Sequence, residues 1–242
     1  MAETYREDLA HIHHAGFGGL ARGAAPYVLG LLETAPRVHG LVVELGCGSG
    51  ILLERLTSAG YRALGVDASP AMLRLAGATA PAASLRRGSL WRSPIPPCDA
   101  VLAVGEALCY ASRRGLGDRP TERLFARVAR ALPPGGVFLF DVMVTARAAP
   151  APYRSWEAGD GWAVVVEVKP AGGRRLTRAI TTFRRVRGRW RRDEETHTVR
   201  LFERADLVRQ LRHAGFAVRT ARAYGGSALP PGRTAFLARK RA

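Results

Sequence analysis

A glycine-rich turn between an apolar strand and an amphipathic helix constrains the fold of this chain more than any other feature. Residues 40–45 predict a short buried strand, which runs into Gly46-Cys47-Gly48-Ser49-Gly50. Glycine at every second position lets the main chain approach a ligand more closely than side chains would permit. The helix expected at 51–59 would point its N-terminal amides at the same place, which favours a polar or anionic group. The turn therefore predicts a ligand site at the carboxyl end of a strand.

Strands and helices alternate along the first 150 residues. One or two helices are expected at 5–33, another begins at Ser69-Pro70, and another spans 121–132. Because each strand between helices is nearly all apolar, the pattern predicts a parallel sheet that is covered on both faces. The predicted strands are 40–45, 62–67, 83–87, 99–104 and 137–142.

The alternation stops after residue 150, where strand follows strand. Three strands are expected, at 162–168, 176–186 and 190–202, with glycine-containing turns between them. They predict an antiparallel extension inserted after the fifth strand. A helix at 206–214 and two strands at 216–222 and 234–240 would complete the fold.

The next strand carries an acid that suits a nucleoside. Asp67 ends the strand at 62–67 and stands 21 residues after Gly46, so it can accept hydrogen bonds from both hydroxyls of a ribose. The dinucleotide fingerprint requires a further glycine, where this chain has Ile51. The spacing therefore argues against NAD or FAD and indicates a different nucleoside cofactor.

Five short stretches occur in an order that resembles the class I S-adenosylmethionine (SAM) methyltransferases of the small-molecule type. The resemblance implies a Rossmann-like sheet of seven strands with helices on both faces, one strand antiparallel near its end, and SAM as the cofactor, with S-adenosylhomocysteine (SAH) as the product. The stretches are VVELGCGSG at 42–50, GVDASPAML at 65–73, GSL at 88–90, DAVLAVGEALCY at 99–110 and LPPGGVFLFD at 132–141.

The same resemblance implies which residues meet the cofactor. The glycine turn would contact the methionine part, Asp67 the ribose, and the residues after the third strand the adenine. Ser89 stands where the family commonly has Asp, and a hydroxyl can still accept a bond from the adenine amino group. The full expected set is Tyr5, Glu44, Gly46, Cys47, Gly48, Gly50, Asp67, Ala68, Met72, Ser89, Leu90, Gly105 and Glu106.

The resemblance also divides the chain, which is expected to be a single domain over residues 1–242. The four predicted parts are N-terminal lid helices at 1–35, a SAM-binding core at 36–149, a substrate-side extension at 150–202, and a C-terminal helix with the last two strands at 203–242.

Two groups of side chains are candidates for acid–base work. On a strand, Glu195 and His197 would share one face, so the carboxylate could orient the imidazole as a base. His14, in a lid helix, is the second candidate. The alternatives are a salt-bridged hairpin for the first group and a solvated helix face for the second. The His-x-His-His run has no acidic partners at ligand spacing, so no metal site is predicted.

The charge of the chain is +17, and it is uneven: residues 151–242 carry 21 Lys and Arg against 8 acids. Nine arginines lie between Arg174 and Arg192 without an acid. They favour an acceptor with a carboxylate or phosphate, or an RNA-docking surface, while arginine-rich composition alone is the competing explanation. The chain has Gly105-Glu106-Ala107-Leu108 where many nucleobase amino-methylases have Asn/Asp-Pro-Pro-Tyr/Phe, so nucleic acid is not the favoured partner.

The function that the sequence predicts is methyl transfer from SAM to N or O of a small molecule. An RNA or protein methyltransferase and a SAM-binding module without turnover stay open as alternatives. With three scattered cysteines and no apolar run long enough to span a membrane, we expect a cytoplasmic protein without a membrane contact. Oligomeric state and acceptor identity do not follow from the sequence.

Overall fold

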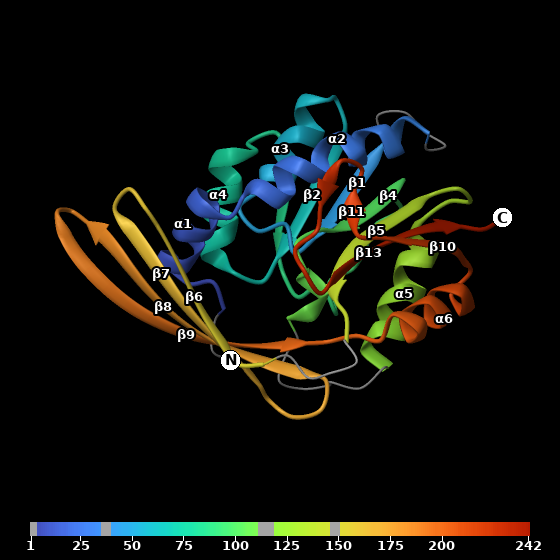
Figure 1. The fold of residues 1–242 in the computed structure, drawn as a ribbon. Helices are drawn as coiled ribbons and strands as arrows, with labels where there is room; N and C mark the ends of the chain where they lie inside the picture. Colours follow the sequence, from blue (N-terminus) through green and yellow to red (C-terminus); the bar gives the residue numbers. More distant parts are fainter. Residues whose placement is uncertain (1–3, 35–39, 111–118, 146–150) are drawn as a thin grey trace.

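The computed structural model describes residues 4–34, 40–110, 119–145 and 151–242, and it is built on a mixed sheet of seven strands (Figure 1). The strand order is β10-β13-β5-β4-β1-β2-β3. Only β13 runs antiparallel to its neighbours, β5 and β10. The predicted sheet, including its one reversed strand, is confirmed. The strands are β1 (Leu41–Leu45), β2 (Arg62–Asp67), β3 (Ser84–Arg87), β4 (Ala100–Ala103), β5 (Val137–Met143), β10 (Phe216–Ala221) and β13 (Arg233–Lys240).

Alternate residues of the central strands point into two separate cores, as a doubly covered sheet requires. Val42 packs with α2 and α3 on one face, while its neighbour Val43 packs with α5 on the other. Figure 1 shows α2 and α3 on one side of the sheet and α5 and α6 on the opposite side. The helices are α1 (Glu7–Gly16), α2 (Gly19–Glu33), α3 (Ile51–Ser58), α4 (Pro70–Thr79), α5 (Arg119–Ala131) and α6 (Arg204–His213), with a short 3-10 helix η1 (Ala107–Cys109).

A second sheet of four antiparallel strands follows β5. It consists of β6 (Tyr153–Gly159), β7 (Trp162–Pro170), β8 (Arg175–Val186) and β9 (Arg189–Arg200), in that order. The predicted three strands are β7, β8 and β9; β6 was missed. Every residue of β6 is exposed, so this edge strand lacks the apolar alternation that reveals a strand in a sequence. A small hairpin of β11 (Ala223–Tyr224) and β12 (Ser227–Ala228) also went unpredicted.

The helix α1 lies between the second sheet and α4. Leu9 and Ile12 on one side of α1 pack against Trp162 and Ile180 of the second sheet. On another side, Ala10 packs against α4. The helix α2, by contrast, buries its apolar side in the core that covers the central sheet. Of the two helices in the predicted lid segment, α1 is therefore the one that borders the second sheet.

No helix among the described residues is long and apolar enough to cross a lipid bilayer. Nor do three or more His, Cys, Asp or Glu side chains in those residues converge in a way that could hold a metal ion.

Candidate active site

The glycine turn after β1 has a left-handed backbone at each of its three glycines. Gly46, Gly48 and Gly50 all have positive φ, at 76°, 52° and 80°. A Cβ at Gly46 would lie 2.6 Å from the Cβ of Ala107, and one at Gly50 would lie 2.9 Å from the backbone of Ala76. A Cβ at Gly48 would meet nothing within 4 Å. Gly46 and Gly50 are thus required by packing as well as by φ, while Gly48 borders open space.

Asp67 is tied to this turn. The backbone N–H of Gly48 donates to Oδ2 of Asp67 at 2.9 Å, and the N–H of Ser69 donates to Oδ1 at 2.8 Å. Burial raises the pKa of the Asp67 carboxyl, and the backbone hydrogen bonds oppose that rise. The predicted turn and the predicted acid therefore meet at the carboxyl edge of the sheet. Each carboxylate oxygen keeps a lone pair for a further donor.

Glu44 supplies a buried acceptor beside the same turn. Its side chain is 3% exposed, and Oε2 has no hydrogen-bond partner in the described residues. Burial, with a smaller contribution from nearby Asp67, raises the pKa of Glu44 well above its usual value. An unpartnered buried carboxyl is costly unless a ligand completes it. A cation-bearing nucleoside such as SAM fits this pair of acids and the open space at Gly48.

Cys47 lies in the turn, but its side chain faces the protein. It is 6% exposed and belongs to the core between α3 and the sheet. A Cβ added at Gly65 would lie 2.8 Å from its Sγ atom. Only the backbone of Cys47 is left to face a ligand.

The residues expected near adenine differ in their surroundings. Ala68 is exposed, whereas Met72 is buried against Ala10 of α1. Leu90 Cδ2 lies 4.0 Å from where a Cβ at Gly46 would stand, so it reaches the glycine turn. The Ser89 hydroxyl already accepts a bond from the N–H of Trp91 at 3.3 Å.

A second strained turn follows β4, where Gly105 and Glu106 have φ of 85° and 57°. Left-handed backbone is costly for a residue with a side chain, so it persists only where neighbours enforce it. Asp141 within β5 enforces it here, because its carboxylate accepts the N–H groups of Gly105 (2.7 Å) and Glu106 (3.0 Å). Tyr224 donates its hydroxyl to the same carboxylate at 2.7 Å. The sequence did not identify Asp141.

The Glu106 side chain is buried between two arginines. Arg178 of β8 binds both of its oxygens, and Arg233 at the start of β13 lies 3.2 Å from Oε2. Arg233 also approaches Asp141, at 3.6 Å. Two cations and two carboxylates thus neutralise one another at the carboxyl edge. These arginines come from parts of the chain that sequence reasoning did not connect with Glu106.

Two tyrosines meet above this group. The hydroxyls of Tyr5 and Tyr110 are 2.9 Å apart, and Tyr110 also donates to Oε1 of Glu106 at 3.3 Å. Burial is the main reason that the pKa of Tyr5 rises to about 12, and that of Tyr110 rises as well. Both phenols are therefore protonated at neutral pH. Tyr5 is thus linked to Glu106 through the hydroxyl of Tyr110, and its ring also packs against the cluster that contains Met72.

The predicted Glu195–His197 pair forms on β9. Nε2 of His197 lies 2.8 Å from Oε2 of Glu195, and the two side chains are 1% and 4% exposed. Because a carboxylate only accepts hydrogen bonds, it holds the proton of His197 on Nε2 and leaves Nδ1 as the acceptor. Nδ1 is buried and has no partner among the described residues. The rings of Tyr5 and Tyr110 border the imidazole, with centroids at 5.1 and 5.6 Å.

His14 lies elsewhere. Its Nδ1 atom is 2.9 Å from the hydroxyl of Ser49 in the glycine turn, so it is on the cofactor side of the site. The adjacent His13, which belongs to the same histidine cluster, packs edge-on against Tyr5 with ring centroids 5.3 Å apart. Nδ1 of His13 is buried and unpartnered in the described residues, and burial lowers its pKa to about 4.

The arginine-rich hairpin is mostly neutralised by the protein itself. Six of the nine arginines between positions 174 and 192 have a carboxylate partner. Arg184 and Arg191 share Asp8 of α1, and Arg174 reaches the start of α6. These ion pairs argue against the open anion-binding surface that the arginine run favoured.

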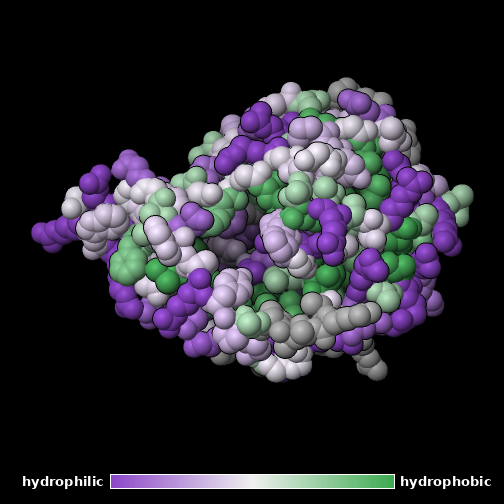
Figure 2. All heavy atoms as spheres, in the orientation of Figure 1, coloured by the Kyte–Doolittle hydropathy of each residue, from purple (hydrophilic) through white to green (hydrophobic). Residues whose placement is uncertain are grey.

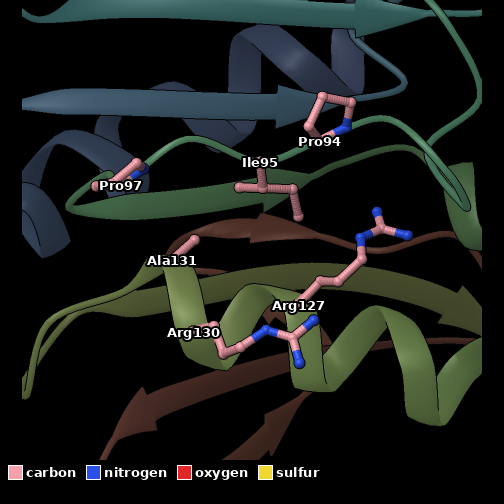
Figure 3. A pocket seen from close by; sticks show the side chains of 6 residues that line it. All are labelled: Pro94, Ile95, Pro97, Arg127, Arg130 and Ala131. Atoms are coloured by element: carbon pink, nitrogen blue, oxygen red, sulfur yellow. The ribbon is translucent and has the colours of Figure 1, made fainter.

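The surface is hollowed between the second sheet and the main body of the molecule (Figure 2). A separate hollow of about 270 Å³ lies between α5 and the segment before β4 (Figure 3). Pro94, Pro97 and Ala131 line it near the amino ends of β4 and β5, the edge opposite the glycine turn. It is not part of the site.

Comparisons with known proteins agree with this geometry. Residues 42–136 match a family model described as a methyltransferase domain. An S-adenosylmethionine-dependent methyltransferase from Clostridium acetobutylicum superposes with a TM-score of 0.80 at 18% identity, covering 96% of this chain and 98% of the other. A search of curated proteins found no match.

Two sugar-modifying enzymes have the same architecture. The sugar N-methyltransferase KedS8 from Streptoalloteichus sp. has a TM-score of 0.76 at 20% identity, covering 100% of this chain and 96% of the other. The SAM-bound amino pentose methyltransferase CalS10 from Micromonospora echinaspora has a TM-score of 0.75 at 19% identity, covering 99% and 100%. At these identities the likeness establishes the fold.

The fold is that of the class I methyltransferases. The family match covers the glycine turn and the strands that follow it, so residues 42–136 resemble a methyltransferase domain.

Proposed function

We propose that the protein transfers the methyl group of SAM to an amine nitrogen of a small, polar acceptor. The acceptor would enter between the second sheet and the carboxyl ends of β4 and β5. The observation that carries this proposal is the wall of buried and half-buried polar side chains that four separate segments bring together there. These side chains are Tyr5, Glu106, Tyr110, Arg178 and His197.

The size and charge of this wall favour a small acceptor over a macromolecule. Arg178 and Arg233 are committed to Glu106 and Asp141, so the wall offers no unpaired charge to a phosphate backbone. Most of the hairpin arginines are paired too, and RNA affinity depends on cations that are free to replace counterions. The same pairing removes the reason to expect an anionic acceptor.

Nitrogen is favoured for two reasons. Two of the structural neighbours are named as an N-methyltransferase of sugars and an amino pentose methyltransferase. In addition, a neutral amine is already nucleophilic, while a hydroxyl needs a strong base. Among the described residues of the wall, one buried polar atom has no partner: Nδ1 of His197, an acceptor that suits an N–H group.

The cofactor side of the site would be held as the sequence predicted. We assign the methionine part to Glu44 and the backbone of Gly46, Cys47, Gly48 and Gly50, and the ribose to Asp67. Ala68, Met72, Ser89 and Leu90 would border the adenine. Gly105, Glu106 and Tyr5 would lie next to the reacting methyl group.

SAM supplies a methyl group that is already activated by its positive sulfur. The protein's part is to align the acceptor nitrogen with the methyl carbon and to exclude water. As the N–C bond forms and the C–S bond breaks, one N–H proton must leave the nitrogen. His197 is the candidate to receive it on Nδ1, with Glu195 fixing the ring. His14, beside Ser49, would act on the cofactor.

The direct test is transfer of labelled methyl from SAM to a panel of amino sugars and small amines, their hydroxyl analogues, and bulk RNA. We expect labelled amines only. Label in RNA, or in the hydroxyl analogues without the amines, would contradict the proposal.

The role of His197 has its own test. His197→Gln keeps a donor toward Glu195 but removes Nδ1, and we expect kcat to fall while SAH affinity is kept. His213→Gln, at an exposed position of α6, is the matched control. Equal kcat in the two variants would remove His197 from the mechanism.

A further inference from the structure

One buried hydroxyl joins the cofactor side of the site to the acceptor side. Ser69 is 3% exposed and stands two residues after Asp67. Its Oγ accepts the N–H of Met72 at 3.1 Å, which caps α4, and donates to the backbone carbonyl of Tyr5 at 2.7 Å. The N–H of Ser69 is bound to Asp67 itself. Through its backbone N–H and its hydroxyl, a single residue therefore links the predicted ribose acid with the N-terminal segment.

Tyr5 is held in a conformation that needs such a link. Its φ is +56°, a left-handed value that is unfavourable for a residue with an aromatic side chain. The strain is maintained by bonds on both sides of the residue: Ser69 holds the carbonyl, and Glu195 accepts the N–H at 2.7 Å. In this conformation the phenol reaches Tyr110. Strained backbone of this kind concentrates at functional sites.

The bonds of Tyr5 and the next residue extend into the second sheet. Glu195 accepts the N–H of Arg6 at 2.8 Å with its other oxygen and also binds His197. The Arg6 guanidinium binds Asp193 on the same strand. Movement at Ser69 would therefore change the position of Tyr5 and, through Glu195, the orientation of His197.

We propose that Ser69 is a positioning residue that couples occupation of the cofactor site to the arrangement of the acceptor wall. Cofactor bound at Asp67 restricts the motion of Ser69 at the start of α4. The Ser69 hydroxyl then holds Tyr5 in its left-handed conformation, and the bond from Tyr5 to Glu195 fixes His197 in the acceptor wall. Cofactor binding thus precedes and prepares acceptor binding. The inference rests on the proposed function only in taking Tyr5, Tyr110 and His197 as the acceptor wall.

Hydrogen exchange with SAH as the probe tests this coupling without any acceptor. In the wild type, saturating SAH should slow exchange in the peptides that cover residues 4–10 and 189–200. The expected slowing is about fivefold, the factor that one neutral hydrogen bond contributes. Ser69→Ala should bind SAH yet lose this slowing in both peptides. Ser69→Thr keeps the hydroxyl and should behave as the wild type.

A third variant separates the coupling from simple capping of α4. Ser69→Asp keeps an acceptor for the N–H of Met72 but has no proton for the carbonyl of Tyr5. Loss of the slowing in Ser69→Ala and Ser69→Asp, with retention in Ser69→Thr, supports the proposal. If Ser69→Asp retains it, the cap alone matters and the proposal is wrong. Exposed Ser58 provides the control, Ser58→Ala.

Two further outcomes are distinct. If SAH binds the wild type but slows exchange only near the glycine turn, the coupling does not exist and the proposed function is untouched. If SAH does not bind the wild type at all, the proposed function itself fails. Should Ser69→Ala fail to fold, the comparison of Ser69→Asp with Ser69→Thr still decides the question.

Discussion

Substitution of Glu195 by Gln would test whether one carboxylate holds the N-terminal segment in place. Three donors converge on Glu195: the N–H of Tyr5 at 2.7 Å, the N–H of Arg6 at 2.8 Å and Nε2 of His197 at 2.8 Å. A carboxylate can satisfy all three, because it has only acceptor sites. Glutamine has the same shape, but its NH2 group must face at least one of the donors.

The magnitude follows from the lost bond. A hydrogen bond to a charged group contributes about 1.5–3 kcal/mol, and the Glu195 side chain is only 4% exposed, so solvent screens it little. We therefore expect Glu195→Gln to make opening of residues 4–10 easier by about 2 kcal/mol. At about 1.4 kcal/mol per factor of ten, the opening equilibrium rises about 30-fold.

The assay is hydrogen exchange at residues 4–10, measured with kcat/KM for whichever acceptor the amine panel yields. Glu157→Gln is the matched control, since it makes the same charge change at an exposed position of β6. Exchange in Glu195→Gln that matches both the wild type and the control would refute the reasoning. It would mean that packing of α1, and not Glu195, holds the segment.

Three other substitutions give independent checks. Gly46→Ala should lower the free energy of urea unfolding clearly more than Gly48→Ala does. Both substitutions add roughly 1–2 kcal/mol of left-handed strain, but only the new Cβ at position 46 also clashes with Ala107. Equal losses would argue against the clash. Asp141→Asn should lower the free energy of unfolding by about 3 kcal/mol, because it removes the charge that the Gly105–Glu106 turn and Tyr224 bind. A loss below about 1 kcal/mol would show that the turn keeps its conformation without this carboxylate. Burial lowers the pKa of His13 from 6.5 in the unfolded chain to about 4 in the folded protein. Between these two pH values the unfolded chain binds more protons, so the free energy of unfolding falls as the pH drops below 6.5. The wild type should lose about 2 kcal/mol more than His13→Asn between pH 7.5 and pH 5, and parallel pH profiles of the two proteins would contradict the burial of His13.

The meeting of the glycine turn with Asp67 could be predicted from the sequence because its information is local. The glycine turn, Asp67 and the apolar strands lie within short segments whose periodicity and turn chemistry fix their structure. Glu195 and His197 were paired correctly for the same reason, since alternate residues of a strand share a face. The exposed edge strand β6 was missed because no buried face marks it.

The acceptor wall was only partly predictable because its residues meet through long-range contacts. Arg178 faces Glu106 only because β8 lies opposite the end of β4, and no spacing rule connects positions 72 residues apart. Asp141 looks like any acid at a strand end until its bonds to the Gly105–Glu106 turn are seen. The hairpin arginines were interpreted as an anion-binding surface because their carboxylate partners on α1 and α6 are far away in the sequence.

The bond between Tyr5 and Glu195 spans 190 residues, and this separation bears on how the site is made. Contacts between distant residues form late in folding, because the loop they close is costly in entropy. The glycine turn and Asp67 can pair as soon as β1 and β2 exist. The acceptor wall must wait for β9 to be synthesised and for Tyr5 to find it. During synthesis the proposed cofactor site can therefore form well before the proposed acceptor wall.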